Sequence, residues 1–271
     1  MNESMRKIET VKPVAPYLGG KSRLAKVIVP IIENIDHKTY AEPFVGMGGI
    51  FLRRKQVPKS EVINDYSKDV SNFFRILQRH YIAFLDMMKW QLTTRAEFDR
   101  LTAANPETLT DLERAARFLY LQRLAFGGKP SGRNFGVDPL RGGRFDITKL
   151  VPMLEDLHMR LTAVTVESLD YKAFIKRYDR PTTLFYLDPP YYGCEKDYGA
   201  DLFTRDEFKK MAKLLKGIKG SFILSLNDHE DVRKIFKSFN QESVDTIYTV
   251  SGGQRATKAK ELLISNRELF T

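Results

Sequence analysis

Seven short apolar runs along the chain have the length and composition of buried strands, and segments with helical spacing of apolar residues lie between most of them. The runs span residues 39–41, 61–64, 163–166, 183–187, 221–226, 244–250 and 261–264. Alternation of strands and helices is typical of folds in which helices cover a mostly parallel sheet. The sequence therefore predicts an α/β sheet as the main architecture.

The segment between the second and third runs, residues 66–161, has a different pattern because apolar residues at helical spacing dominate it. Glycines and prolines then interrupt any regular element between residues 126 and 144. Loops of this length inside a compact domain are commonly functional. We predict a catalytic domain built from residues 1–65 and 162–271, interrupted by a mainly helical domain at 66–161 that ends in a long polar loop.

Composition narrows the class of protein. Lys and Arg total 44 against 34 Asp and Glu, and the net charge of +10 favours polyanionic partners, although charge alone is weak evidence. A single cysteine, Cys194, excludes an intramolecular disulfide framework and a zinc ribbon. Apolar runs are far shorter than the roughly 20 residues of a membrane span. We expect a cytoplasmic monomer with no metal and no membrane partner.

A glycine-rich segment, AEPFVGMGGIF at 41–51, follows the first predicted strand and contains Gly46 and Gly48. Such a turn lets the backbone approach a ligand closely, and Asp65 after the next strand is placed to bind ribose hydroxyls. Upstream, PYLGGKSRL at 16–24 offers a second anion or carboxylate clasp near a helix N-terminus, including Lys21. The alternatives are a dinucleotide site, a tight turn without a ligand, and Ser22 as an ordinary helix cap.

The segment LFYLDPPYYG at 184–193 runs from an apolar strand directly into a stiff turn with two prolines. Ligands of open α/β sheets bind beyond the carboxyl ends of the strands, so this turn belongs to the active crevice. The Asp188 carboxylate and the Pro189 carbonyl are two acceptors able to draw an amino nitrogen such as that of adenine toward a tetrahedral, nucleophilic form. Tyr191 is placed to stack on a base that has been flipped out of a duplex. Cys194 is interpreted as incidental.

In their order along the chain, these motifs resemble those of the Dam-type DNA adenine methyltransferases, the alpha group of amino-methyltransferases. The matching segments are PYLGGK at 16–21, EPFVGMGG at 42–49, VINDYS at 62–67, VESLDY at 166–171, DPPYYG at 188–193 and KELLISNR at 260–267. The resemblance implies a Rossmann-like, seven-stranded methyltransferase sheet with an antiparallel edge hairpin at 244–264. It also implies S-adenosyl-L-methionine as the cofactor, double-stranded DNA as the partner, and target recognition by the helical insertion.

By this resemblance the catalytic residues are Asp188, Pro189 and Tyr191. The cofactor-binding residues it implies are Tyr17, Gly19, Lys21, Glu42, Pro43, Phe44, Gly46, Gly48, Asp65, Asp170 and Asp188. One segment departs from the family pattern: residues 125–129 read AFGGK where the best-known members carry an Asn-Gly-containing sequence after an aromatic residue. The resemblance therefore does not extend to the target sequence GATC.

The loop after this segment is rich in basic residues and is expected to enter the DNA. The residues expected to contact DNA are Arg123, Lys129, Arg133, Asn134, Arg141 and Arg144. Arg133 beside Asn134 offers the side chains suited to bidentate contacts with guanine and adenine edges. The alternative is a solvated basic loop that touches only phosphates.

Two other functions remain open at this point. The first is methylation of an amino group in RNA or of a protein amide by the same turn, although those enzymes usually carry Asn in place of Asp188. The second is a DNA-binding module with a decayed enzyme core, which the joint presence of Asp188, Tyr191, Asp65 and the glycines disfavours. In SLND at 225–228, Asp228 is expected to cap the helix that begins near His229.

Overall fold

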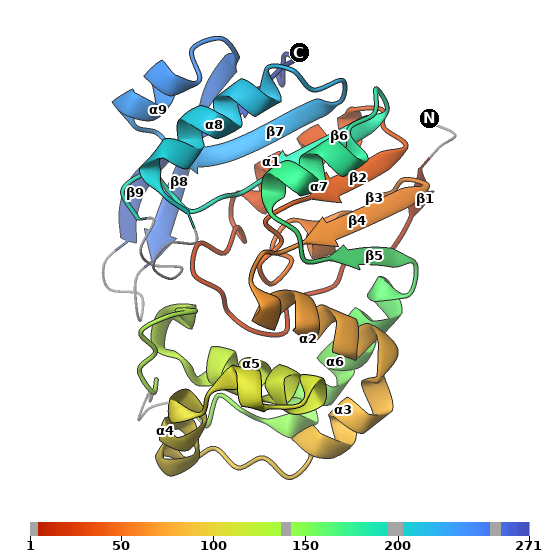
Figure 1. The fold of residues 1–271 in the computed structure, drawn as a ribbon, viewed down its shortest axis with the longest axis vertical. Helices are drawn as coiled ribbons and strands as arrows, with labels where there is room; N and C mark the ends of the chain where they lie inside the picture. The colour runs from red at the N-terminus through yellow and green to blue at the C-terminus, as the bar shows by residue number, and fades with distance from the viewer. Residues whose placement is uncertain (1–4, 137–141, 195–202, 250–255, 271) are drawn as a thin grey trace.

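The computed structural model describes residues 5–136, 142–194, 203–249 and 256–270. Its centre is a seven-stranded sheet with the strand order β5-β4-β2-β6-β7-β9-β8 (Figure 1). The strands are β2 (Thr39–Glu42), β4 (Ser60–Asn64), β5 (Val164–Glu167), β6 (Thr183–Leu187), β7 (Ser221–Asn227), β8 (Asn240–Thr249) and β9 (Ala256–Ser265). The strands from β5 to β7 run parallel, and β9 pairs antiparallel with both β7 and β8. The predicted α/β sheet with an antiparallel edge hairpin is confirmed.

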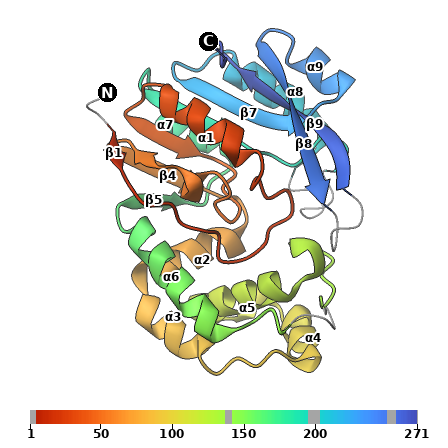
Figure 2. The same ribbon diagram turned by 180° about the vertical axis from the view of Figure 1, so that it is seen from behind.

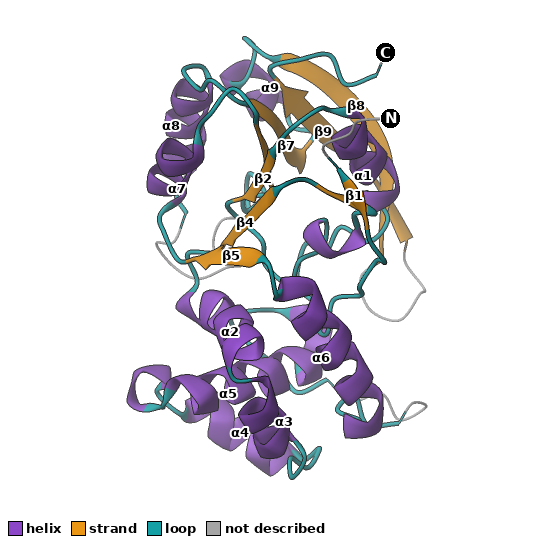
Figure 3. Cartoon of the chain, turned by 90° about the vertical axis from the view of Figure 1, so that its right-hand side faces the viewer, coloured by secondary structure: helices purple, strands orange, loops and turns teal. Residues whose placement is uncertain are grey.

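Helices cover both faces of this sheet. The helices α7 (Tyr171–Tyr178), α8 (Arg205–Leu215) and α9 (Glu230–Ile235) share one apolar cluster with β6 and β7, and α1 (Ala25–Asn34) lies on the opposite face (Figures 2 and 3). Because both faces are covered, every residue of β6 is buried. The helix α1 begins after Leu24, so Ser22 is not its cap. The strands β1 (Arg6–Lys7) and β3 (Gln56–Val57) form a second, two-stranded antiparallel sheet.

The segment between β4 and β5 forms a separate helical layer below the sheet in Figure 1. Its helices are α2 (Lys68–Arg79), α3 (Tyr81–Met88), α4 (Arg95–Ala103), α5 (Asp111–Leu124) and α6 (Ile147–Leu161). Short 3-10 turns occur at η1 (Phe51–Arg53), η2 (Pro106–Thr108) and η3 (Phe126–Gly128). The Phe73 ring contacts the rings of Phe84 and Phe118 within this layer, with centroid distances of 6.0 and 5.7 Å. The helix α5 begins with a capping box in which Thr110 and Glu113 bind each other's backbone N–H.

A buried charge cluster joins the helical layer to the sheet. Arg160, in the last turn of α6, donates two hydrogen bonds of 2.7 and 2.8 Å to the Glu61 carboxylate on β4. Arg54 also donates to Glu61 and lies 3.6 Å from the centroid of the Tyr40 ring. Two buried guanidinium groups thus share one buried carboxylate, a pairing that offsets the cost of removing these charges from water. Within the described ranges, no helix combines the length and apolar composition that crossing a bilayer requires.

Candidate active site

A cavity of about 970 Å³ lies where the carboxyl ends of β2, β4 and β6 face the helical layer. Its walls come from the N-terminal segment 12–24, the glycine-rich loop 42–50, residues 65–69 and the loop that follows α5. Glu42 ends β2, Asp65 follows β4 and Asp188 follows β6, and all three line the cavity. Parallel strands place their carboxyl ends at one edge, which is where α/β sheets bind ligands.

The glycine-rich loop can follow its path only with glycine at two positions. Gly46 and Gly48 have φ angles of 50° and 75°, in the left-handed region that side chains disfavour. A Cβ atom at Gly46 would lie 3.1 Å from the Tyr17 ring, and one at Gly48 would lie 2.8 Å from Leu52 Cγ. The loop therefore brings its backbone directly against the Tyr17 side chain at the cavity wall.

Asp65 holds this loop through its carboxylate. Its Oδ2 accepts a hydrogen bond of 2.9 Å from the Gly46 N–H, and its Oδ1 accepts one of 2.9 Å from the Ser67 N–H. Burial raises the pKa of Asp65 to about 6, while the two backbone donors oppose that rise. The carboxylate is thus fixed at the cavity wall and remains mostly ionised at neutral pH.

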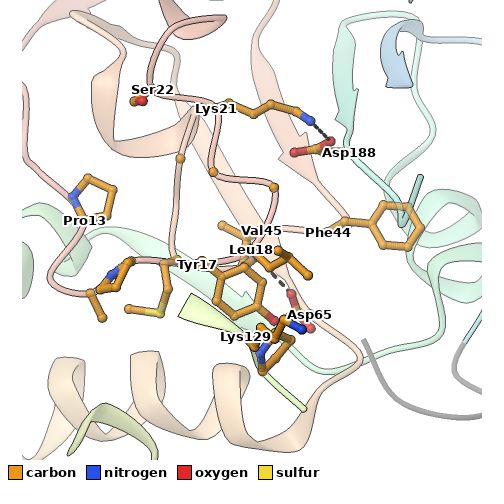
Figure 4. Close-up of a pocket in the computed structure, with 18 of the residues that line it drawn as sticks. Pro13, Tyr17, Leu18, Lys21, Ser22, Phe44, Val45, Asp65, Lys129 and Asp188 are labelled. Carbon is orange, nitrogen blue, oxygen red and sulfur yellow. Dashed lines mark hydrogen bonds and ion pairs between the residues drawn. The ribbon is translucent and has the colours of Figure 1, made fainter. Parts of the chain in front are cut away.

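The turn after β6, predicted to be catalytic, contacts the N-terminal segment through a lysine. The buried Lys21 Nζ lies 2.8 Å from Asp188 Oδ1 and donates a hydrogen bond of 2.6 Å to the Tyr191 hydroxyl. Figure 4 shows the Lys21 side chain extended toward Asp188. Ser225 on β7 donates to the same Oδ1 atom at 3.2 Å. Burial raises the pKa of Asp188 to about 6, and the Lys21 ammonium opposes that rise.

Glu42 differs from Asp188 in its electrostatic environment. Its Oε2 accepts a hydrogen bond of 2.6 Å from the Tyr40 hydroxyl, and the side chain is almost fully buried. Burial, with the nearby Asp188 charge as a lesser cause, raises the pKa of Glu42 to about 8. Glu42 is therefore mainly protonated at neutral pH, so the cavity wall carries both a neutral and an ionised carboxyl group.

Aromatic side chains form another part of the wall. The Phe44 ring lies 5.6 Å from the Tyr171 ring and 6.1 Å from the Phe203 ring, measured between centroids. Phe44 and Phe203 both line the cavity. This aromatic group offers a surface on which a planar ring can pack.

The structure brings most of the predicted site residues to this one cavity. Those that line it are Tyr17, Gly19, Lys21, Glu42, Phe44, Gly46, Asp65, Arg123, Lys129, Arg133 and Asp188. Pro43, Gly48, Asp170, Pro189, Tyr191, Asn134 and Arg144 are not in its lining. Asp170 is exposed and caps α7 by accepting a hydrogen bond from the Lys172 N–H at 2.9 Å, so its cofactor role stays a prediction. Arg141 lies outside the described residues.

The arginines of the loop after α5 occupy different environments. Arg123 donates through all three guanidinium nitrogens to backbone carbonyls, those of Val14 and Arg144, so it braces the loop and is a poor candidate for DNA contact. Arg133 lines the cavity, and its buried Nε has no hydrogen-bond partner among the described residues. Asn134 is exposed, and its carbonyl accepts from the Phe126 N–H at 2.8 Å. Arg133 and Asn134 are adjacent but face different surroundings.

The start of this loop is attached to the N-terminal segment. The fully buried Gln122 donates from Nε2 to the carbonyls of Pro16, at 2.8 Å, and Gly128, at 2.6 Å. The Leu18 N–H donates to the same Gly128 carbonyl at 2.9 Å. Gly128 has a φ of 66°, and a Cβ atom there would lie 2.9 Å from the Pro16 carbonyl carbon. The predicted recognition loop and the predicted cofactor segment therefore share one set of hydrogen bonds.

Asp228 and Glu261 have contacts that the sequence did not indicate. The helix α9 is capped by His229, whose Nδ1 accepts from the Asp231 N–H, so the prediction that Asp228 caps it is wrong. Asp228 instead pairs with Arg233 through two hydrogen bonds.

Sequence reasoning also missed Glu261, a fully buried carboxylate on β9. A carboxylate in an apolar strand is the signal that could have revealed it, because a buried charge needs a partner.

Comparison with known proteins gives a consistent result. The family model for D12 class N6 adenine-specific DNA methyltransferases matches residues 17–250. A type II methyltransferase, M.CviBI of Paramecium bursaria Chlorella virus NC1A, is 23% identical over 84% of this chain and 88% of its own length. The type II methyltransferase M1.LlaDCHI of Lactococcus lactis subsp. cremoris is 22% identical over 98% of this chain and 99% of its own length. A DNA N-6-adenine-methyltransferase of Escherichia phage P1 is 28% identical over 76% of this chain and 28% of its own length.

Proposed function

Because the chain belongs to the D12 class N6 adenine-specific DNA methyltransferase family, we propose that it transfers a methyl group from S-adenosyl-L-methionine to the exocyclic amino nitrogen of a flipped adenine in duplex DNA. The observation that carries the proposal is the position of Asp188 beside a cavity that also contains the glycine-rich loop and Asp65. We further propose that residues 1–65 and 162–271 act as the catalytic domain, residues 66–161 as the target-recognition domain, and that the enzyme is a monomer.

The cavity residues fit this cofactor. A volume of about 970 Å³ is large enough for a nucleoside with an amino-acid arm, and the close approach of Gly46 to Tyr17 keeps side chains out of the loop. Asp65 and Phe44 line the cavity; in this proposal Asp65 would bind the ribose hydroxyls and Phe44 would offer an aromatic face. When bound, the cofactor would supply an electrophilic methyl group on a sulfonium. Asp170 and Pro43 remain proposed members of this site.

The catalytic turn supplies acceptors to the target nitrogen. An adenine amino nitrogen is a poor nucleophile because its lone pair is delocalised into the ring. Asp188 Oδ1 is engaged by Lys21 and Ser225, so Oδ2 is the oxygen that we propose meets the target. Together, Oδ2 and the Pro189 carbonyl would accept the two amino N–H bonds and stabilise the positive charge that develops on the nitrogen. The Tyr191 ring would stack on the flipped base.

A labelled-methyl assay tests the proposed function. The purified protein is offered unmethylated duplex DNA, RNA and protein separately, and digested products are analysed for N6-methyladenine. We expect label in adenine of duplex DNA alone; label confined to RNA or protein would overturn the proposal, and absence of transfer would support a decayed DNA-binding module.

Asp188→Ala provides the inactive control. We expect turnover below about a tenth of wild type with near-normal cofactor affinity, because the carboxylate acts on the target amino group. Retention of more than that activity would show that Asp188 is not the acceptor.

A further inference from the structure

Glu261 connects the closing strand of the sheet to the catalytic turn. It lies on β9 and is fully buried, and its Oε1 and Oε2 both accept from the Tyr191 hydroxyl at 2.8 Å. Its Oε1 also lies 3.2 Å from Lys21 Nζ. The ammonium of Lys21 therefore lies between two carboxylates, those of Glu261 and Asp188, which come from different strands.

The charged groups around Asp188 affect how readily its carboxyl group ionises. The groups that face Asp188 from the surrounding elements are Lys21 of the N-terminal segment, Glu42 of β2, Tyr186 of β6, Tyr191 of the turn, Ser225 of β7 and Glu261 of β9. Lys21 is the cation among them. A buried ammonium is stable only while it is paired, and Glu261 supplies a second anionic partner from a rigid strand.

Resting on the proposed function, we propose that Glu261 is a positioning residue: it fixes the Lys21 ammonium on Asp188 Oδ1, so that Oδ2 is presented to the target amino group. The geometry supports this assignment because Glu261 contacts both groups that touch the turn, Lys21 and the Tyr191 hydroxyl. A β-strand buried in the sheet holds its side chains more firmly than a loop does, which suits a group that must set an orientation.

The proposal predicts that replacing Lys21 and replacing Glu261 shift the pH profile of methyl transfer in opposite directions. In Lys21→Met the loss of the cation leaves Asp188 harder to ionise, so the acidic limb of the rate profile should move up by roughly 1 to 3 pH units. In Glu261→Gln a competing negative charge is lost, so the same limb should move down by about one unit. The Gln amide oxygen can still accept from Lys21, so the ammonium stays near Asp188. The plateau rate of Glu261→Gln should nevertheless fall by roughly tenfold, because a neutral amide holds Lys21 and Tyr191 less firmly in the productive geometry. A role confined to folding would leave the plateau rate of the folded Glu261→Gln variant near that of the wild type.

Single-turnover methylation of duplex DNA is measured from acidic to mildly alkaline pH with saturating cofactor. The matched control is Glu242→Gln, which removes an exposed carboxylate from the neighbouring strand β8. Carbon-13 NMR of the Asp188 carboxyl in the cofactor-free protein gives the same titration without any activity. Shifts in opposite directions together with a lowered plateau rate in Glu261→Gln, with Glu242→Gln unchanged, would support the proposal.

Shifts in the same direction, no shift in either variant, or a wild-type plateau rate in folded Glu261→Gln would overturn it. If Glu261→Gln fails to fold by thermal unfolding, Glu261→Asp takes its place: it keeps the charge but withdraws the carboxylate, so the plateau rate should fall, and a wild-type rate would refute the positioning role. If the wild type transfers no methyl group to adenine, the proposed function fails, while the Asp188 titration still tests the positioning role.

Discussion

Replacing Asp65 by Asn should weaken cofactor binding without unfolding the protein. The carboxylate accepts backbone hydrogen bonds from Gly46 and Ser67, one on each oxygen, and it lines the cavity. An asparagine keeps only one acceptor oxygen, so its amide group must face one of these N–H donors. The ribose hydroxyls then meet a neutral amide in place of the carboxylate, and the loss of one hydrogen bond to a charged group costs about 1.5 to 3 kcal/mol. Affinity should therefore fall by roughly tenfold to 150-fold.

Isothermal calorimetry of S-adenosyl-L-methionine binding measures this change directly. The control is Asp99→Asn, because Asp99 is exposed on α4 and lies outside the cavity lining. We expect the control to keep wild-type affinity. Unchanged affinity in Asp65→Asn would remove Asp65 from the cofactor site, and an equal loss in both variants would show that the effect is not local.

Three further outcomes are expected. Burial raises the pKa of Glu42 from 4.5 to about 8. Between these pH values the folded state keeps a proton that the unfolded state releases, so the contribution of Glu42 to the free energy of unfolding falls as pH rises. Urea unfolding should show the wild type losing up to about 1.4 kcal/mol per pH unit relative to Glu42→Gln in that window; a constant difference would refute the shift. Glu61→Gln should cost about 3 to 5 kcal/mol in the free energy of unfolding, since Arg54 and Arg160 lose their shared carboxylate; a loss below 1 kcal/mol would argue against a buried pair. If Arg133 reads a base, Arg133→Ala should lose about 1 to 3 kcal/mol of binding free energy on the matched duplex and discriminate less against single-base changes. An equal loss of affinity for all duplexes, with a weaker salt dependence, would identify a phosphate contact instead.

The sheet could be predicted from the sequence because its strands carry their own signal. The strands β6 and β7 are buried over nearly their whole length, and this requires continuous apolar runs that are visible locally. The edge strand β8 begins at Asn240, four residues before the predicted start, in the polar stretch NQES. At an edge, one face meets solvent, so backbone pairing with β9 rather than apolar composition determines where the strand begins.

The cavity was predictable only in part. Motifs such as those at Gly46, Asp65 and Asp188 place ligand-binding groups at strand ends, and topology then brings them together. The contact between Lys21 and Tyr191 joins residues 170 positions apart, so no local pattern could indicate it. Arg123 is a second example. Its place in a basic loop predicts a DNA contact, and only the structure shows that its guanidinium donates to backbone carbonyls instead.

Two kinds of interaction thus determine this site. Apolar burial decides that helices and strands form, but an apolar interface alone tolerates small changes in how two layers are placed. Buried polar groups are more selective, because each donor left without an acceptor costs about 1 to 3 kcal/mol. The Arg160–Glu61 pair fixes the far end of the helical layer against β4, and Gln122 fixes its loop against the segment that carries Lys21. The orientation of the loop relative to Asp188 therefore depends on a few buried hydrogen bonds, and these are the contacts that sequence periodicity does not encode.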